Sequence, residues 1–233
     1  MTACEVIPTY EEADNLPPLV AAVRAALDCT IGIVDDGSPD GTGALADALA
    51  DWVIHRDRKQ GLASAYVAGF RRALAEGAEY VLEMDADFSH DPADLPRLLD
   101  AARAGADVVL GSRYVEGGGV EGMPLHRRLL SRGGSAYARA VLGCPLRDLT
   151  GGFKCFRADA LRAIDLDAIA ATGFAFQVEA TYRAVRAGLR VEELPIVFAN
   201  GGRGTASCRP ASPPRRSGAS PRCAEPVRRG AHG

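Results

Sequence analysis

Tyr80-Val81-Leu82-Glu83-Met84 is a mostly apolar run that ends in Asp85-Ala86-Asp87 and is followed by a helix start at Asp91-Pro92. A short apolar run before turn residues predicts a buried strand, and the two carboxylates come where that strand ends. If the chain stays extended there, Asp85 and Asp87 point to the same side, because side chains alternate with period two. Such a pair suits a divalent cation shared with substrate phosphates, but the same residues also suit a helix-capping cluster.

The same order of strand and helix recurs on both sides of this segment. Leucines and valines between residues 16 and 27 follow the i, i+3, i+4, i+7 spacing of an amphipathic helix. Strands are expected at 4–8, 31–35, 52–55, 79–84 and 107–111, and helices at 16–27, 42–50, 62–76 and 92–104. This alternation predicts an α/β fold with parallel βαβ units in a mostly parallel, doubly wound sheet.

The pattern changes after residue 113. A glycine-rich loop is expected at 116–122, and a basic helical stretch at 124–142 with a break at Gly133-Gly134. Further strands are expected at 150–156 and 190–198, with a helix at 175–187 between them.

Polar clusters follow the expected strands at residues 9–12, 35–40, 85–89 and 112–113. In doubly wound sheets, ligands bind at the carboxyl ends of the strands. Asp35-Asp36-Gly37-Ser38 is either a tight turn with a cap or a place where a carboxylate meets a nucleobase or ribose. Tyr10 could likewise stack on a base and Glu12 bind ribose hydroxyls, unless residues 9–12 are only a loop with a capping acid.

The amino-acid composition limits the classes of protein to which the chain can belong. The 233 residues are 47% hydrophobic and 24% charged, which is ordinary for a globular chain with a core. No stretch approaches the roughly 18–20 apolar residues of a membrane span, and the N-terminus lacks signal-peptide features, so we expect a cytosolic location. The six cysteines show no metal-ligand spacing and are expected to be free thiols, and His55, His90 and His126 are expected to be structural or surface residues.

Charge divides the chain in two. Residues 1–199 hold 20 Lys and Arg against 29 Asp and Glu, whereas residues 200–233 hold seven Arg and one Glu. The later segment also has five Pro and six Gly and too little apolar surface to offset the entropy of ordering it. We therefore expect a catalytic domain over 1–199 and a disordered tail over 200–233.

Taken together, several motifs resemble family 2 glycosyltransferases, and more narrowly the dolichyl- or polyprenyl-phosphate β-mannosyltransferases. The first motifs are Val6-Ile7-Pro8-Thr9-Tyr10-Glu11-Glu12, Val34-Asp35-Asp36-Gly37-Ser38, Asp85-Ala86-Asp87-Phe88-Ser89 and Gly111-Ser112-Arg113-Tyr114. The later motifs are Ser131-Arg132-Gly133, Asp148-Leu149-Thr150-Gly151-Gly152-Phe153 and Phe176-Gln177-Val178-Glu179. The resemblance covers residues 4–199.

The resemblance implies a GT-A fold and metal-dependent, inverting transfer of mannose from GDP-mannose to a polyprenyl or dolichyl monophosphate. The residues it assigns to the nucleotide sugar are Pro8, Tyr10, Glu12, Val34, Asp36, Asp85 and Ala86. It assigns Mg²⁺ or Mn²⁺ to Asp87, with Ser89. Asp85 is expected beside the sugar or ribose, and Arg113 against phosphate, because a guanidinium fork matches phosphate geometry.

The chemistry of such a reaction follows from the acceptor. A phosphomonoester with a second pKa near ~6 is largely dianionic at neutral pH, so no strong general base is required. The protein must instead overcome repulsion between two anionic substrates. Arg113, with Arg127, Arg128 or Arg132, is expected to meet the acceptor phosphate, although the latter three equally suit a solvated or membrane-facing helix.

The chain departs from the family after Phe198-Ala199. There the family continues with Asp-Arg and then Gly-x-Ser-Lys, which complete its phosphate site, whereas this chain reads Asn200-Gly201-Gly202-Arg203. Our hypothesis is that the tail is translated out of frame. An alternative frame that encodes the missing motif in the nucleotide sequence would support this hypothesis, and its absence would end it.

Two other functions stay open: a relative that uses UDP-glucose or another sugar nucleotide, and an inactive nucleotide-binding protein without the closing phosphate motif. For the leading function we expect a peripheral location at the cytoplasmic face of a membrane and no nucleic-acid partner. Attachment is expected either through residues 124–142 as an amphipathic interfacial helix or through a separate membrane-embedded partner protein.

Overall fold

Strands and helices alternate through the first half of the chain, as predicted. The computed structural model describes residues 2–122, 124–169, 173 and 175–199. In chain order the first elements are β1 (Ala3–Thr9), α1 (Leu16–Ala26), β2 (Thr30–Asp35), α2 (Thr42–Leu49), β3 (Trp52–His55), α3 (Leu62–Ala75), β4 (Tyr80–Glu83), the 3₁₀ helix η1 (Pro92–Asp94), α4 (Leu95–Arg103) and β5 (Val108–Ser112). The elements that follow are β6 (Gly119–Glu121), α5 (Leu125–Leu142), β7 (Lys154–Arg157), α6 (Ala158–Ala163), η2 (Leu166–Ala168), α7 (Ala175–Arg186), β8 (Val191–Pro195) and β9 (Val197–Ala199).

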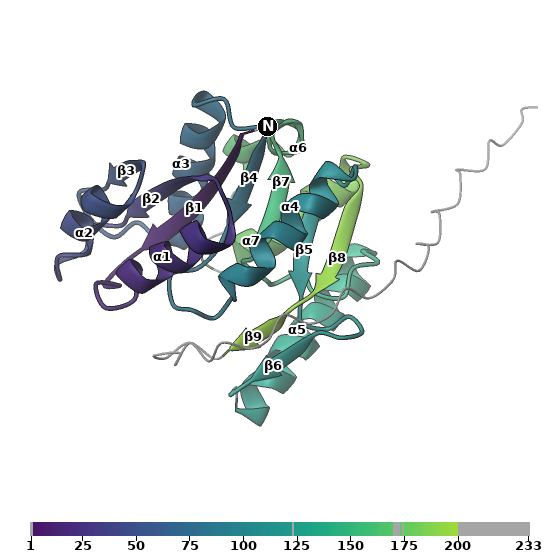
Figure 1. Cartoon of the computed structure of the whole chain (residues 1–233). Helices are drawn as coiled ribbons and strands as arrows, with labels where there is room; N and C mark the ends of the chain where they lie inside the picture. The colour runs from purple at the N-terminus through teal and green to yellow at the C-terminus, as the bar shows by residue number, and fades with distance from the viewer. Residues whose placement is uncertain (1, 123, 170–172, 174, 200–233) are drawn as a thin grey trace, which may run out of the picture.

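Seven strands form one sheet in the order β3-β2-β1-β4-β7-β5-β8. The described pairs are parallel except those of β7, which runs antiparallel to both β4 and β5. The predicted mostly parallel, doubly wound sheet is therefore confirmed. The parallel strands end at the edge of the sheet where α5, β6 and β9 lie (Figure 1), so the polar residues that follow those strands gather there.

Helices cover both faces of the sheet, and alternate residues of β1 show the division. Ile7 packs on the side of α1 and α4, whereas Val6 packs on the side of α3, α6 and α7. Both side chains are fully buried. A strand with apolar side chains on both faces is typical of a sheet enclosed between two helical layers.

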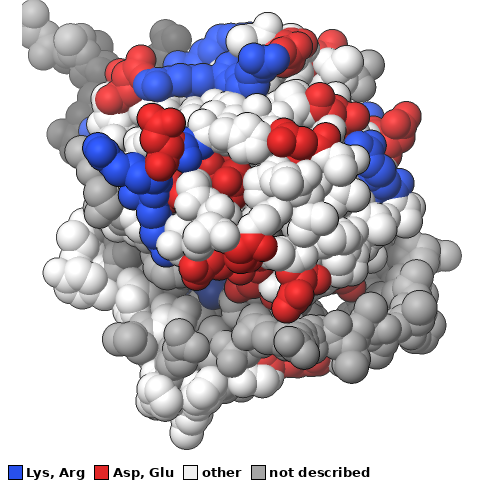
Figure 2. Space-filling model, turned by 90° about the vertical axis from the view of Figure 1, so that its left-hand side faces the viewer, with Lys and Arg blue, Asp and Glu red and all other residues white. Residues whose placement is uncertain are grey.

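Charged side chains are dispersed over the side of the molecule that carries β3 and α2, where acidic and basic groups lie interspersed (Figure 2). Exposed pairs from these elements and their neighbours include His55–Asp47 at 2.8 Å and Arg24–Asp51 at 3.3 Å. In the part of the chain that the structure describes, no helix combines the length and the apolar character needed to cross a bilayer.

The expectations for the second half were less accurate. The break at Gly133-Gly134 is wrong, because α5 runs without interruption through both glycines. Two glycines disfavour a helix by only about 2 kcal/mol, and Ser135 beside them is buried, so packing outweighs the local cost.

Strand boundaries in this half also differ from the predictions. The strand expected at 150–156 begins only at Lys154, because residues 148–150 are held in a loop around Asp148. The strand expected at 190–198 divides at Ile196: β8 pairs with β5, and β9 pairs with β6, which lies inside the expected glycine-rich loop. The predicted disordered tail at 200–233 lies outside the described residues.

Candidate active site

The acidic segment after β4 is a turn rather than a continuation of the strand. β4 ends at Glu83, and Phe88 has a left-handed backbone conformation with φ of 57°. The backbone N–H of Ser89 donates to Asp87 Oδ1 at 2.9 Å. The extended-chain reasoning for Asp85 and Asp87 is therefore wrong, because the turn, not strand alternation, positions the two carboxylates.

Asp85 is held from behind by a tyrosine of α3. The Tyr66 hydroxyl donates to Asp85 Oδ1 at 2.8 Å. Burial raises the pKa of Asp85 to about 7, and the neighbouring charges of Asp87 and Glu83 raise it too, while the Tyr66 hydrogen bond opposes the shift. A carboxylate in this state holds a proton near neutral pH and releases it to solvent when a cation binds.

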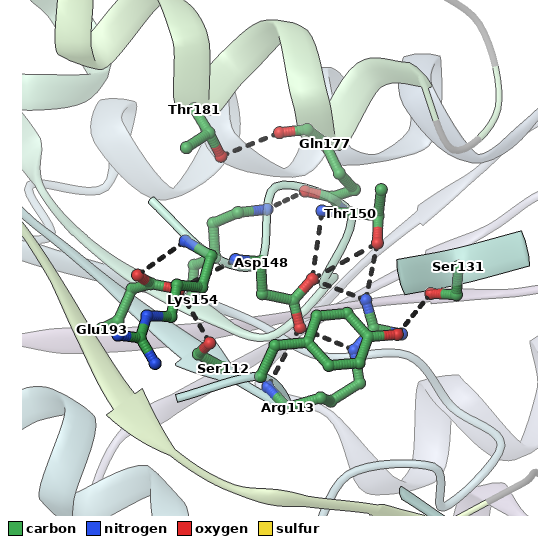
Figure 3. A network of polar contacts seen from close by, with 11 residues as sticks. Ser112, Arg113, Ser131, Asp148, Thr150, Lys154, Gln177, Thr181 and Glu193 are labelled. Atoms are coloured by element: carbon green, nitrogen blue, oxygen red, sulfur yellow. Dashed lines mark hydrogen bonds and ion pairs between the residues drawn. The ribbon is translucent and has the colours of Figure 1, made fainter. Parts of the chain in front are cut away.

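A buried ion pair lies beneath this turn. Lys154 Nζ, from β7, is 2.7 Å from Glu83 Oε1 and also donates to Gln177 Oε1 of α7. The side chains of Lys154 and Glu83 are fully buried. Burial raises the pKa of Glu83, against the opposing effect of Lys154. Figure 3 shows Lys154 pointing toward Gln177 from the neighbouring strand, so three elements lock the floor of the site.

The donor set of the turn fits a divalent cation that also binds phosphate. Asp85 and Asp87 are both partly exposed, and Glu12 is close enough for the charge of Asp87 to raise its pKa, after the larger effect of burial. Residues 2–199, apart from the few that the structure does not describe, hold no group of three or more Asp, Glu, His or Cys arranged as a metal cage. Mg²⁺ does not need one, since it commonly takes one or two carboxylates and completes its shell with water and substrate phosphates.

Ser89, the second expected metal ligand, already has a protein partner. Its hydroxyl is buried and lies 3.3 Å from His90 Nδ1. His90 stacks on Phe153 and meets the edge of Phe198, and burial lowers its pKa to about 4, so it is neutral at physiological pH. The structural role expected for His90 agrees with this packing.

The end of β9 closes over the same turn. The backbone N–H of Ala199 donates to the carbonyl of Ser89 at 2.9 Å. Ala199 is the last described residue. The position at which the sequence leaves the family pattern therefore lies directly beside the candidate metal turn.

The residues assigned to the nucleotide line the ends of β1 and β2. Pro8 and Val34 are paired across these strands and buried, and Ala86 is buried beside Asp85. The Tyr10 ring is partly exposed, with Lys59 Nζ 3.5 Å from its centroid. Glu12 accepts a hydrogen bond from Asn15 Nδ2 at 2.7 Å.

Asp36 has several protein partners. Arg56 Nη1 lies 3.0 Å from Asp36 Oδ1, and the backbone N–H groups of Gln60 and Gly61 donate to the same carboxylate. Asp36 therefore fixes the loop between β3 and α3 against the end of β2. In this structure it shapes the expected nucleotide site.

Arg113 is clamped by the loop that precedes β7. Its Nε donates to Asp148 Oδ2 and its Nη2 to Asp148 Oδ1, both at 2.7 Å, and Nη2 also donates to Thr150 Oγ1 (Figure 3). Although burial opposes ionisation of Asp148, the hydrogen bonds and charge of Arg113 lower its pKa. The pair is nearly inaccessible to solvent, and these hydrogen bonds leave Nη1 for another ligand.

The remaining expected phosphate ligands belong to α5. Arg132 is exposed, with its guanidinium carbon 5.7 Å from the centre of the Tyr114 ring, and that of Arg113 is 5.2 Å from the same ring. The Tyr114 ring is thus a neighbour of both the buried arginine and the exposed one. The side chains of Arg127 and Arg128 lie outside the described part of the chain.

Sequence reasoning did not select Tyr66, Arg56 or Lys154. Lys154 stands between Phe153 and Cys155 in an apolar strand, and a buried lysine is rare without a partner, so this position carried a usable signal. Tyr66 lies on the apolar face of α3 among core residues, and nothing in its sequence context distinguishes it from them.

Comparison with known proteins shows the family of this chain. Residues 5–165 match the model of glycosyl transferase family 2. The chain belongs to this family. It is therefore a glycosyltransferase, as predicted from the motifs.

Curated relatives extend the similarity over most of the chain. It is 48% identical over 204 residues to the undecaprenyl-phosphate mannosyltransferase of Micrococcus luteus, covering 85% of this chain and 84% of that protein. It is 49% identical over 200 residues to the polyprenol monophosphomannose synthase of Mycolicibacterium smegmatis, covering 83% and 76%. It is 35% identical over 213 residues to the dolichol-phosphate mannosyltransferase of Pyrococcus furiosus, covering 88% and 58%.

Solved structures identify the fold. Glucosyl-3-phosphoglycerate synthase from Mycobacterium tuberculosis, in complex with Mn²⁺, uridine diphosphate and glucosyl-3-phosphoglycerate, superposes with a TM-score of 0.64 at 20% identity, covering 84% of this chain and 70% of that one. The same enzyme with Mn²⁺ and UDP-glucose gives a TM-score of 0.65 at 19% identity, covering 88% and 72%. The predicted GT-A fold is confirmed.

Proposed function

We propose that this glycosyltransferase transfers mannose from GDP-mannose to a polyprenyl or dolichyl monophosphate, with inversion and with Mg²⁺ or Mn²⁺. The observation that carries the proposal is its 48–49% identity, over most of both chains, to two bacterial enzymes named for mannosyl transfer to polyprenyl phosphate. The acidic turn after β4, with its two partly exposed carboxylates, and the nearly buried Arg113 support the proposal.

The donor would bind along the ends of β1, β2 and β4. Tyr10 and Glu12 would face the base and ribose, over a floor formed by Pro8 and Val34. Asp36 would act mainly by fixing the loop at Gln60 and Gly61, because its carboxylate accepts hydrogen bonds from both N–H groups.

Asp87 would hold the metal, with Asp85 and Ala86 beside the diphosphate and sugar. A divalent cation bound there neutralises the charge that develops on the departing nucleoside diphosphate. Tyr66 keeps Asp85 oriented from below. The Ser89 hydroxyl contributes as a ligand only if it leaves His90.

The acceptor needs positive charge rather than a base. Arg113 would present Nη1 to phosphate while Asp148 and Thr150 hold the rest of its guanidinium. Arg127 and Arg132 of α5 are the other proposed contacts to the acceptor. Direct attack by a phosphate oxygen on the anomeric carbon, opposite the leaving group, gives inversion in a single displacement.

We place the protein at the cytoplasmic face of a membrane as a peripheral enzyme. Leu125, Leu129, Tyr137 and Val141 of α5 are 62–72% exposed. Leu125 and Leu129 are four residues apart, as are Tyr137 and Val141, so each pair forms neighbours on the helix surface. An exposed apolar face beside arginines suits an interfacial helix, whether or not a membrane-embedded partner adds to the attachment.

The test is turnover by the full chain with a divalent metal, labelled GDP-mannose and a polyprenyl phosphate in detergent or vesicles. Metal-dependent appearance of lipid-linked mannose is expected. Transfer from UDP-glucose but not from GDP-mannose would replace the donor in this proposal. Binding of GDP-mannose without any transfer would favour an inactive protein whose closing phosphate motif is missing.

A further inference from the structure

Most arginines whose side chains the structure describes are paired with acids, and five are not: Arg58, Arg132, Arg139, Arg147 and Arg186. Eleven arginines form ion pairs with an aspartate or glutamate. Within the described residues no such pair involves Arg132, Arg139 or Arg147. These three side chains line a single hollow of about 220 Å³, together with Tyr114 and Ala136. We call it the arginine hollow.

Helix geometry explains how two of the arginines face one space. Arg132 and Arg139 are seven residues apart, which places them two turns apart on one side of α5, about 10.5 Å along its axis. Ala136 lies between them and leaves room, because its side chain is a single methyl group. This volume is far above the roughly 10–15 Å³ that one water molecule needs, so the hollow has space for a phosphate group and part of its hydration shell.

The third arginine is brought in by a rigid loop. α5 ends at Leu142, and its C-cap residue Gly143, with a left-handed φ of 63°, reverses the chain. Leu146 is buried, and the backbone N–H of Arg147 donates to Glu193 Oε2 at 2.8 Å. Asp148 follows, and its backbone N–H donates to the other oxygen of Glu193 (Figure 3). The backbone of Arg147 is thus fixed while its side chain stays exposed.

Arg132 is also positioned before any ligand arrives. Its guanidinium lies over the Tyr114 ring, and the Tyr114 hydroxyl donates to Ser131 Oγ at 2.7 Å. Positive groups held near one another repel, so their proximity without acidic partners favours an anion between them. Guanidinium groups bind phosphate by charge-assisted hydrogen bonds.

The surroundings of the arginine hollow indicate which phosphate it meets. Arg132 follows Leu129 by three residues, so it lies next to the exposed apolar face of α5 on the helix surface. We propose that Arg139 and Arg147, with Arg132 at the border toward Arg113, bind the phosphate of an anionic membrane phospholipid. The site shares Arg132 with the proposed acceptor contacts, but its two main ligands, Arg139 and Arg147, are not among those contacts, and lipid binding there does not depend on transferase activity.

The experiment is vesicle flotation of the full chain, with no polyprenyl phosphate present. Vesicles of phosphatidylcholine alone are compared with vesicles that also contain phosphatidylglycerol. The wild type is expected to prefer the anionic vesicles and to lose that preference as salt increases. Arg139→Gln and Arg147→Gln are each expected to lower the partition coefficient on anionic vesicles about fivefold, with little effect on phosphatidylcholine.

The matched control is Arg186→Gln, which removes an exposed arginine from the last turn of α7, outside the hollow. It is expected to change the partition coefficient less than about twofold, and thermal unfolding checks that all variants fold. Anionic-vesicle binding by both hollow variants equal to that of the wild type would overturn the proposal.

Two further measurements distinguish a phospholipid from the other phosphate groups that the hollow could bind. If the variants lose binding only on phosphatidylcholine vesicles doped with polyprenyl phosphate, the hollow belongs to the acceptor and the proposal is wrong. If inorganic phosphate competes for the hollow as effectively as anionic vesicles do, at equal phosphate concentration, the hollow binds soluble anions and the proposal is again wrong.

Discussion

The acidic edge of the sheet and the arginine hollow handle charge in opposite ways. At the acidic edge, Asp36 and Asp85 are held by hydrogen bonds from neighbouring elements, and the ion pair Lys154–Glu83 lies beneath. In the hollow, the arginines are exposed, and none has an acidic partner among the described residues. Carboxylates that the protein already orients form a preorganised binding site for a cation. Exposed arginines, in contrast, stay hydrated until an anion binds.

Arg113 and Asp148 lie where these two regions meet, and breaking their pair should have the largest effect. Asp148→Asn leaves Arg113 nearly buried without a counter-charge, and we expect a loss of about 3–5 kcal/mol in the free energy of unfolding. Urea denaturation measures it.

The double variant Arg113→Met/Asp148→Leu should recover most of this stability, because it removes both charges. As a control, Asp159→Asn disrupts the exposed pair with Arg162 and should cost no more than about 0.5 kcal/mol. If Asp148→Asn lowers the free energy of unfolding no more than the control does, the Arg113–Asp148 pair contributes no more to stability than an exposed ion pair.

Removing the charge of the metal turn should abolish most activity. Asp87→Asn keeps an acceptor for the Ser89 N–H but loses the anionic ligand, so we expect turnover to fall about 10²–10³-fold at unchanged thermal stability. Asp47→Asn, which removes an exposed acid on α2, should leave turnover unchanged. Full activity of Asp87→Asn would place the metal elsewhere.

The raised pKa of Asp85 predicts an effect of pH on stability. Its ordinary value is 3.8 and its value in the metal-free protein is about 7. Between these values the unfolded chain ionises first, so this group's contribution to stability falls as pH rises from about 4 to 7. A saturating divalent cation needs the ionised form, so its stabilising effect should grow over the same range.

Thermal unfolding with and without Mg²⁺, from pH 4.5 to 8, measures both trends. In Asp85→Asn the stabilisation by Mg²⁺ should lose most of its dependence on pH in this range. A variant that keeps the full dependence would assign the titration to another group.

The smallest effect is expected from Tyr66, which only orients Asp85. Tyr66→Phe removes one hydroxyl that donates to Asp85 Oδ1, at a cost of about 1 kcal/mol. We expect KM for the nucleotide sugar to rise about fivefold, while Tm falls by only a few degrees because the ring keeps its packing against Phe70 and Phe176. A fall in Tm with KM unchanged would make Tyr66 a purely structural residue.

Much of the site was predictable because its residues follow strands. Alternation of apolar runs with helical stripes indicated a parallel sheet, and the carboxyl ends of its strands brought Glu12, Asp36, Asp85 and Arg113 to one edge. The second half was predicted less well, since β6 and β9 are short strands that form through their mutual pairing. Local pattern carries little information about contacts between segments nearly 80 residues apart.

Local order and residue type were thus determined by the sequence itself: the strand ends of the first half, the acidic residues that follow β4, the helical character of residues 124–142 and the point at which the family pattern stops. Tertiary structure alone decided which charges are satisfied. Asp148 occupies the fork of Arg113, Tyr66 reaches Asp85, and Arg147 returns to face α5. These partners come from separate elements, so only packing, which fixes distances and excludes water, determines whether a charged side chain is already paired or open to a ligand.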